Sequence, residues 1–184
     1  DKNLYIYNSY IYRYFKSINM KNFKYILFSL ILLSCQDAAD ENPWNGVVTS
    51  DDEKTQIVES LAKTYTEGNF DAALEYFTED GKHFFNTQEY TTKEIIDGYN
   101  FHSVLWDSIQ HVDPGVITVS FNNGTTYTNQ WSDWSGISKT TGEKAESTFH
   151  CWWRWENEKI ISTKCYMDST IITNEIAIYE AANN

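Results

Sequence analysis

Apolar residues recur at intervals of three or four positions between residues 50 and 106, a period typical of amphipathic helices. The first predicted helix begins with a capping box, in which Ser50 and Glu53 would satisfy free backbone amides. Gly68 should end this helix, because glycine readily adopts the positive φ found just after many helices. The inner face of the helix carries Ile57, Leu61 and Tyr65.

A second helix is predicted to begin at Asn69 and to end at Gly81. Its inner side carries Phe70, Ala73, Leu74 and Phe77. Residues 82–85 follow as a short strand candidate. Another capping box, Thr91-Thr92-Lys93-Glu94, begins a third helix. The apolar positions of this third helix are Ile95, Ile96, Tyr99 and, if it extends so far, Trp106.

The period then changes to two, which is typical of strands with one buried face. Strands are predicted at residues 115–121, 125–138, 144–155 and 160–171. The turns between them lie at Asn123-Gly124, at residues 140–142 and at residues 156–158. Helices followed by an antiparallel meander predict an α+β fold with the helices packed on one face of a sheet.

The amino-terminal segment has the pattern of a lipoprotein signal peptide. A basic stretch from Met20 to Lys24 precedes the apolar run 25–33, which is shorter than the roughly 20 residues that span a bilayer. Leu32-Leu33-Ser34-Cys35 resembles a lipobox, in which the peptide is cut before the cysteine and the thiol receives a lipid. An ordinary signal peptide with a chance cysteine, or a short buried helix, are the alternatives.

Four regions follow from this pattern. Residues 1–19 are interpreted as an upstream extension outside the functional protein, and 20–34 as the signal peptide. Residues 35–49 form the lipidated Cys35 and an acidic tether, and 50–184 form the domain. Acidic residues behind the cysteine resemble the surface-export signals of Bacteroidetes lipoproteins. We therefore expect anchoring at the outer membrane of the cell envelope, with periplasmic and surface orientations both open.

Charge excludes one class of partner. The first 35 residues hold five of the 14 basic and one of the 26 acidic residues, which leaves 9 basic and 25 acidic residues and a net charge of −16 on the remainder. Such a domain repels phosphate backbones, so we expect no nucleic-acid partner.

The order of these elements resembles the nuclear transport factor 2-like superfamily over about Asp51 to Asp168. The resemblance rests on residues 68–74, residues 77–80, the third helix and the long meander. The hairpin at Thr141-Gly142 and the ending Glu158-Lys159-Ile160 … Asp168 are most similar to its SnoaL-like polyketide cyclase branch. The resemblance implies a cone, in which a curved antiparallel or mixed sheet wraps around two to three N-terminal helices and leaves a pocket. Family members also commonly form homodimers through the outer sheet face, for which Trp152, Arg154 and Tyr166 are candidates here.

The register of the last two strands decides which side chains would line such a pocket. A three-residue loop around Asn157 places Cys151 opposite Cys165 and separates polar from apolar faces, with Trp155 and Ile161 on the apolar face. A two-residue loop would instead place His150 opposite Cys165. We prefer the first register, which gives the expected ligand-binding residues Trp131, Phe149, Cys151, Trp153, Cys165 and Met167. Cys151 and Cys165 would then form either a disulfide or two buried thiols.

Candidate catalytic residues are few. The isomerase branch of the family has a catalytic tyrosine where this sequence has Leu61. Its two catalytic carboxylates correspond to the strand of His83, which has no carboxylate, and to Cys151 or His150. The absence of these acid and base groups argues against isomerase chemistry. The cyclase branch implies Asp168 as a general base, although this position also suits a cap for Thr170. Asp133, between Trp131 and Trp134, is a second candidate. The hairpins before and after its strand suggest opposite directions for its side chain, so whether Asp133 points into the pocket or to the surface stays open.

We therefore expect a lipid-anchored domain that binds an unknown small apolar or aromatic molecule, and that needs no cofactor. The histidines show no metal-ligand spacing, so no metal site is expected. An enzyme of cyclase, isomerase or dehydratase type, and a homodimeric interaction module, are the alternatives, and whether the chain is an enzyme stays open.

Overall fold

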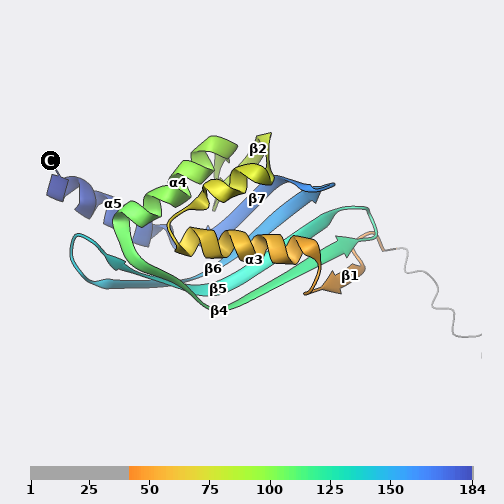
Figure 1. Cartoon of the computed structure of the whole chain (residues 1–184), viewed down its shortest axis with the longest axis horizontal. Helices are drawn as coiled ribbons and strands as arrows, with labels where there is room; N and C mark the ends of the chain where they lie inside the picture. Colours follow the sequence, from red (N-terminus) through yellow and green to blue (C-terminus); the bar gives the residue numbers. More distant parts are fainter. Residues whose placement is uncertain (1–41, 184) are drawn as a thin grey trace, which may run out of the picture. The chain divides into compact units, whose positions relative to one another are not determined.

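A computed structural model describes residues 42–183, which form one α+β unit around a seven-stranded mixed sheet (Figure 1). The strands are β1 (Gly46–Thr49), β2 (Phe77–Phe85), β3 (Gln88–Thr91), β4 (Trp106–Phe121), β5 (Thr126–Ser138), β6 (Lys144–Glu156) and β7 (Lys159–Met167). The helices are α3 (Glu53–Thr66), the 3-10 helix η1 (Phe70–Glu75), α4 (Thr92–Leu105) and α5 (Ser169–Asn183). The sheet order is β1-β4-β5-β6-β7-β2-β3, and β2 pairs with β7 in parallel.

Helix α3 lies across the inner face of the sheet and begins two residues later than the predicted capping box. Asp52, not Ser50, caps it, because the Asp52 carboxylate accepts the amide of Thr55 at 2.7 Å. Val58, Leu61 and Tyr65 are buried, whereas Ile57 is half-buried. The helix ends before Gly68, which has the predicted positive φ of 78°.

The predicted second helix is wrong after its first turns. Only η1 is helical, and the chain is extended from Phe77 onward, where it joins β7. Leu74 is 60% exposed, and Gly81 lies inside β2. A Cβ atom on Gly81 would lie 2.7 Å from Nε2 of His83, so this glycine permits close packing and does not end a helix.

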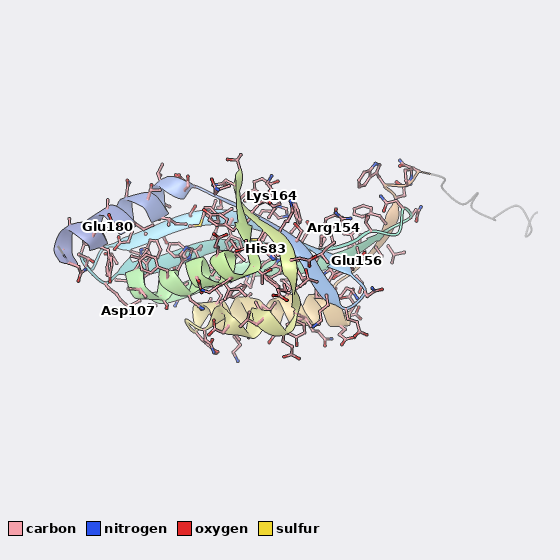
Figure 2. The ribbon with its side chains drawn as sticks, turned by 90° about the horizontal axis from the view of Figure 1, so that it is seen from above. His83, Asp107, Arg154, Glu156, Lys164 and Glu180 are labelled. Carbon is pink, nitrogen blue, oxygen red and sulfur yellow. A yellow bond between two sulfur atoms is a disulfide. The ribbon has the colours of Figure 1, made fainter. Side chains whose placement is uncertain are left out.

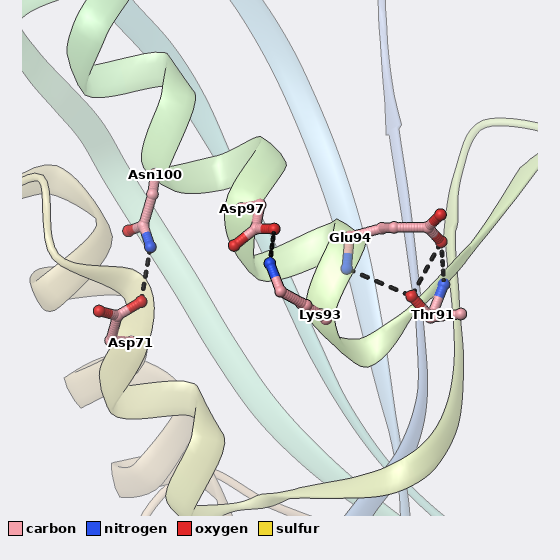
Figure 3. A network of polar contacts seen from close by, with 6 residues as sticks. All are labelled: Asp71, Thr91, Lys93, Glu94, Asp97 and Asn100. Carbon is pink, nitrogen blue, oxygen red and sulfur yellow. Dashed lines mark hydrogen bonds and ion pairs between the residues drawn. The ribbon is translucent and has the colours of Figure 1, made fainter.

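The capping box that begins α4 is confirmed. The Thr91 hydroxyl accepts the Glu94 amide, and the Glu94 carboxylate accepts the Thr91 amide (Figure 3). Asn100 ties this helix to η1, since it donates to Asp71 at 2.7 Å and accepts the Phe70 amide at 2.7 Å. The helix ends at Leu105, and Trp106 begins β4, so that strand is nine residues longer at its start than the predicted one.

The register of β5 places Trp134 inside and its neighbour Asp133 outside. Thr128 and Gln130 pair with Trp153 and Cys151, so the even-numbered residues of β5 point to the helices. Trp131 and Asp133 therefore lie on the outer face, where the Trp131 ring covers Gly115; a Cβ atom on that glycine would come within 2.3 Å of the ring.

Strands β6 and β7 have the preferred register, reached by a different route from the predicted one. Cys151 lies opposite Cys165, and Phe149 opposite Met167. The turn contains two residues, and an irregularity at Ile161 supplies the third, because Trp155 pairs with Ile160 while Arg154 pairs with Ser162. Ile160 is accordingly fully buried, and the placement of Ile161 on the inner face was wrong.

Two elements at the ends of the described chain were not predicted. Strand β1 pairs with β4, so the folded part begins before the expected boundary at Ser50. Strand β7 ends at Met167, and residues 169–171, predicted as strand, begin α5. Helix α5 packs near α4 through Phe101 and Tyr179, and its buried Glu175 accepts the Ser138 hydroxyl at 2.6 Å.

Candidate functional site

A cavity of about 60 Å³ lies between the helices and the inner face of the sheet. Its walls come from α3, η1, α4 and strands β2, β4, β5, β6 and β7. Aromatic side chains form most of this lining, and no Asp, Glu, Lys or Arg of residues 42–183 belongs to it. A site of this composition suits an uncharged apolar group.

The aromatic walls are held by edge-to-face contacts. Phe70 packs against Phe77 at 6.2 Å and against Tyr99 at 5.1 Å between ring centroids, with rings tilted by 78° in both pairs. Trp153 lies 6.1 Å from Phe77. Aromatic pairs prefer this geometry, which fixes the shape of the cavity.

One corner of the cavity is polar. The Tyr65 hydroxyl accepts Nε1 of Trp134 at 2.9 Å and shares a hydrogen bond with Nδ1 of His102 at 2.9 Å. His111 stacks on the Tyr65 ring at 5.3 Å. Burial lowers the pKa of His102 and of His111 to about 4 and raises the pKa of Tyr65, so all three are neutral near pH 7.

His83 lies on β2 (Figure 2). Its side chain is fully buried, and both ring nitrogens are hydrogen-bonded. Thr92 donates its hydroxyl to the Thr78 carbonyl, so Nε2 of His83 must donate to Thr92, at 3.1 Å. Nδ1 then accepts the Thr163 hydroxyl at 2.9 Å. Burial lowers the pKa of His83 to about 4, and this neutral, satisfied ring serves the packing of β2 against α4 and β7.

Three residues of the cavity lining each carry a buried donor that has no partner in the described part of the chain. The donors are Nε2 of Gln130, the hydroxyl of Tyr99 and Nε1 of Trp153. Gln130 is 2% exposed and Trp153 is 4% exposed. Buried donors without partners cost free energy, so these groups suit the acceptor atoms of a ligand or of water.

A disulfide joins Cys151 to Cys165 across β6 and β7. Both cysteines are buried and both line the cavity. Of the two states that the sequence left open, the structure has the bridge, which therefore belongs to the cavity wall.

The structure brings together five of the six residues expected to contact a ligand. Phe149, Cys151, Trp153, Cys165 and Met167 line the cavity. Trp131 does not, because it lies on the outer face of β5 and is 44% exposed; its assignment to the ligand-binding set is corrected.

Neither candidate general base lies in the cavity. Asp133 is exposed on the outer face of β5. Asp168 is exposed after β7, where its carboxylate accepts the hydroxyl of Thr170 at 2.7 Å and its amide at 2.9 Å. These two bonds lower the pKa of Asp168, and the bond from the Thr170 hydroxyl has the larger effect. Asp168 therefore caps the chain at Thr170 and does not lie beside the cavity.

Sequence reasoning missed the polar residues of the cavity. Gln130, Tyr99 and His102 were not candidates, and Tyr65 was predicted only as a core residue. Gln130 and Trp134 could have been found together, since they are four residues apart on one strand and so share a face. Cys35, the candidate lipidation residue, lies outside the described residues.

The outer face of the sheet has a different character. Trp131, His150 and Tyr166 follow one another across β5, β6 and β7, and Trp152 and Lys164 are paired in the next row. Lys164 lies over the rings of Phe84 and Tyr166 at 5.3 and 5.4 Å. Arg154 is exposed on the same face (Figure 2). The residues suggested for dimerisation thus lie where predicted, and dimer formation itself stays a prediction.

Residues 42–183 hold neither a metal-binding cluster nor a helix that could cross a membrane. No group of three or more His, Cys, Asp or Glu side chains is placed to hold a metal ion. None of the helices described there has the length and apolar character needed to cross a membrane.

Comparisons with known proteins support the fold. No protein-family model matches the sequence, and no curated protein matches it. Among solved structures, a proposed polyketide cyclase from Xanthomonas campestris pv. campestris aligns with TM-score 0.53 and 14% identity, over 66% of this chain and 95% of that one.

Two other structures agree with this result. A nuclear transport factor 2-like protein from Burkholderia thailandensis has TM-score 0.51 and 15% identity, over 66% of this chain and 95% of its own. IdmH from Streptomyces antibioticus, described as a proposed polyketide cyclase, has TM-score 0.52 and 10% identity, over 68% of this chain and 99% of its own. At such identities the likeness shows the fold alone, and the fold is nuclear transport factor 2-like, as predicted.

Proposed function

We propose that this domain binds a small apolar or aromatic molecule in the cavity between its helices and sheet, without catalysing a reaction. One observation carries the proposal: the cavity lining combines aromatic walls with three unpartnered buried donors. Most buried donors in proteins are hydrogen-bonded, and three of the five buried side-chain atoms without a partner among residues 42–183 belong to this lining. A ligand with an acceptor atom would satisfy them.

Binding is favoured over the cyclase alternative by the position of the carboxylates. Acid–base chemistry needs a group within hydrogen-bond reach of the proton that it moves. Asp133 and Asp168 are both outside the cavity, so the residues first suggested as bases are not placed for this role.

We also propose that the domain is held at the cell envelope by a lipid on Cys35. The lipobox supports this placement, and so does the Cys151–Cys165 disulfide, because disulfides persist mainly in oxidising compartments outside the cytoplasm.

Native mass spectrometry tests the binding proposal directly. The full chain, extracted from membranes in mild detergent, should carry a small molecule that denaturation releases. Met167→Trp adds bulk at a half-buried position of the cavity lining and should remove most of this bound species. Tyr166→Trp is the matched control, since the neighbouring residue points to the outer face and should retain it.

Equal retention by both variants would place the bound molecule outside the cavity. A chain that carries no molecule and gains none from a library of small neutral apolar compounds, aliphatic as well as aromatic, would contradict the proposed function.

A further inference from the structure

A groove on the surface adjoins the cavity between α3 and β4. It has a volume of about 480 Å³, and its lining includes Glu59, Lys63, Thr66 and Gln110. These four side chains are polar or charged, whereas the apolar part of the lining consists of Ala62, Ile109, Pro114 and Val116. The groove is therefore mixed in character, in contrast with the aromatic walls of the cavity.

The groove and the cavity share three lining residues: Ala62, His111 and Gln130. Ala62 is the smallest residue in either lining, so α3 places little bulk at this point. Strand β4 is irregular on both sides of His111, with register shifts between Asp107 and Gln110 and between Val112 and Gly115. Such bulges bend a strand locally, and they recur beside binding sites.

The size of the cavity argues that it holds only part of a ligand. An engineered cavity of about 150 Å³ in another protein is large enough for benzene. The cavity here, at about 60 Å³, is smaller and suits a group of a few carbon atoms. The adjoining groove supplies several times that space.

The donor at the junction defines the chemistry between the two parts. Gln130 is 2% exposed, and its Nε2 has no partner among residues 42–183. It lines both spaces, so a ligand that passes from one to the other would bring an atom to this amide. At the junction itself His111 is neutral near pH 7, because burial lowers its pKa to about 4, and the acidic Glu59 and basic Lys63 line only the groove. An uncharged junction favours a neutral acceptor such as a carbonyl oxygen.

From these observations we infer that the cavity and the groove form one two-part site for an elongated neutral molecule. Its short apolar end occupies the cavity, a carbonyl oxygen accepts Nε2 of Gln130, and a hydroxyl- or ether-rich remainder lies in the groove over Lys63 and Thr66. This inference rests on the proposed function and adds the class of ligand to it.

Two esters test it. Ethyl butanoate carries the apolar end and the carbonyl, and the butanoate monoester of tetraethylene glycol adds a polar tail. Titration of the full chain, followed by amide shifts in protein NMR, should show at least tenfold tighter binding of the glycol ester. Thr66→Trp should reduce this gain to less than threefold and leave ethyl butanoate unaffected, because Thr66 lines the groove and not the cavity.

Ser60→Trp is the matched control on the same helix. Ser60 is exposed and belongs to neither lining, so the gain from the tail should persist. Gln130→Met keeps the length of the side chain and removes the donor; it should weaken both esters by about fivefold, the usual effect of one hydrogen bond.

The outcomes separate this inference from the function on which it rests. Equal affinity for the two esters, or full retention of the gain in Thr66→Trp, would overturn the two-part site while leaving binding in the cavity intact. An unmodified chain that binds neither ester would contradict ligand binding in the cavity as well.

Discussion

The buried histidines show how single residues link the packing of this domain to pH. His83 and His102 are each at least 92% buried, and burial lowers the pKa of both to about 4. His83 illustrates the cause, since protonation of Nδ1 would remove the acceptor that binds the Thr163 hydroxyl. Each ring must therefore stay neutral in the folded protein.

The free energy of unfolding should fall as pH is lowered from 7.5 to 5.5. In the unfolded chain these two histidines and His111, whose pKa burial also lowers to about 4, titrate near pH 6.5, so the unfolded state binds more protons than the folded state between pH 6.5 and 4. Stability therefore decreases with falling pH in this window, by about 1 kcal/mol per histidine at pH 5.5. Urea unfolding at the two pH values measures the change.

His83→Gln provides the control for this effect. The glutamine amide does not titrate, so the change in unfolding free energy between the two pH values should shrink by the contribution of one histidine. An unchanged dependence would assign it to other groups, such as the many carboxylates.

At the residue scale, the sequence could predict the faces of β6 and β7 but not that of Asp133. Cys151, Trp153 and Cys165 alternate with mostly polar neighbours, so the register that best separates polar from apolar residues gave their inward direction. Strand β5 carries Trp131 and Trp134 on opposite faces, and hydrophobicity cannot rank one tryptophan above the other. What decides is Gly115, which leaves room for the Trp131 ring on the outside.

Individual elements differ in how clearly the sequence marks their ends. The capping box of α4 is local and was predicted correctly. Gly81 was misinterpreted as a helix end because its role depends on tertiary packing. Without a Cβ atom it leaves room for the His83 and Thr92 side chains. Helix α5 did have a signal, since Ile172, Ile176 and Tyr179 are spaced for one face and Asp168 precedes them as a cap.

The pairing of β6 with β7 leads to a prediction about the disulfide. The bridge joins residues 14 apart in sequence, and closing a loop of this length should stabilise the fold by about 3 kcal/mol through the unfolded state. Replacing both cysteines by alanine should lower the free energy of unfolding by about that amount. Urea unfolding with and without a dithiol reductant measures it.

Reductant provides the internal comparison. The unmodified chain should lose stability in its presence, whereas the double alanine variant should not respond. Identical behaviour of the two proteins would mean that the bridge does not form in solution.

For the whole molecule, the order of helices and strands predicted the α+β class, and the cone was implied by the resemblance to the nuclear transport factor 2-like superfamily. Order along the chain limits topology strongly, because neighbouring elements usually pack together. The cavity was only partly predictable, because its lining is assembled from eight elements. Tyr99 and Gln130, for example, are 31 positions apart and share no local motif.

The proposed lipid anchor is also a property of the whole molecule, and it can be tested by mass. Expressed in a bacterium that makes lipoproteins, the chain should begin at Cys35 and carry the added mass of its acyl chains. Cys35→Ala should lose both the cleavage and the lipid, because the thiol is the attachment point. Intact mass spectrometry of the membrane fraction reports both changes.

Ser34→Ala serves as the control, since alanine is also a small residue and should preserve processing. An unlipidated product cut elsewhere would favour an ordinary signal peptide with a chance cysteine.

The irregularity at Ile161 has a consequence for how this hairpin can vary. Side-chain direction in a strand depends only on whether the count of intervening residues is odd or even. Two turn residues and one bulged residue together make an odd number, and that parity alone brings Cys165 to face Cys151. Lengthening the turn by one residue while removing the bulge would leave both faces of the sheet unchanged. Either change alone would reverse β7 and separate the two sulfur atoms.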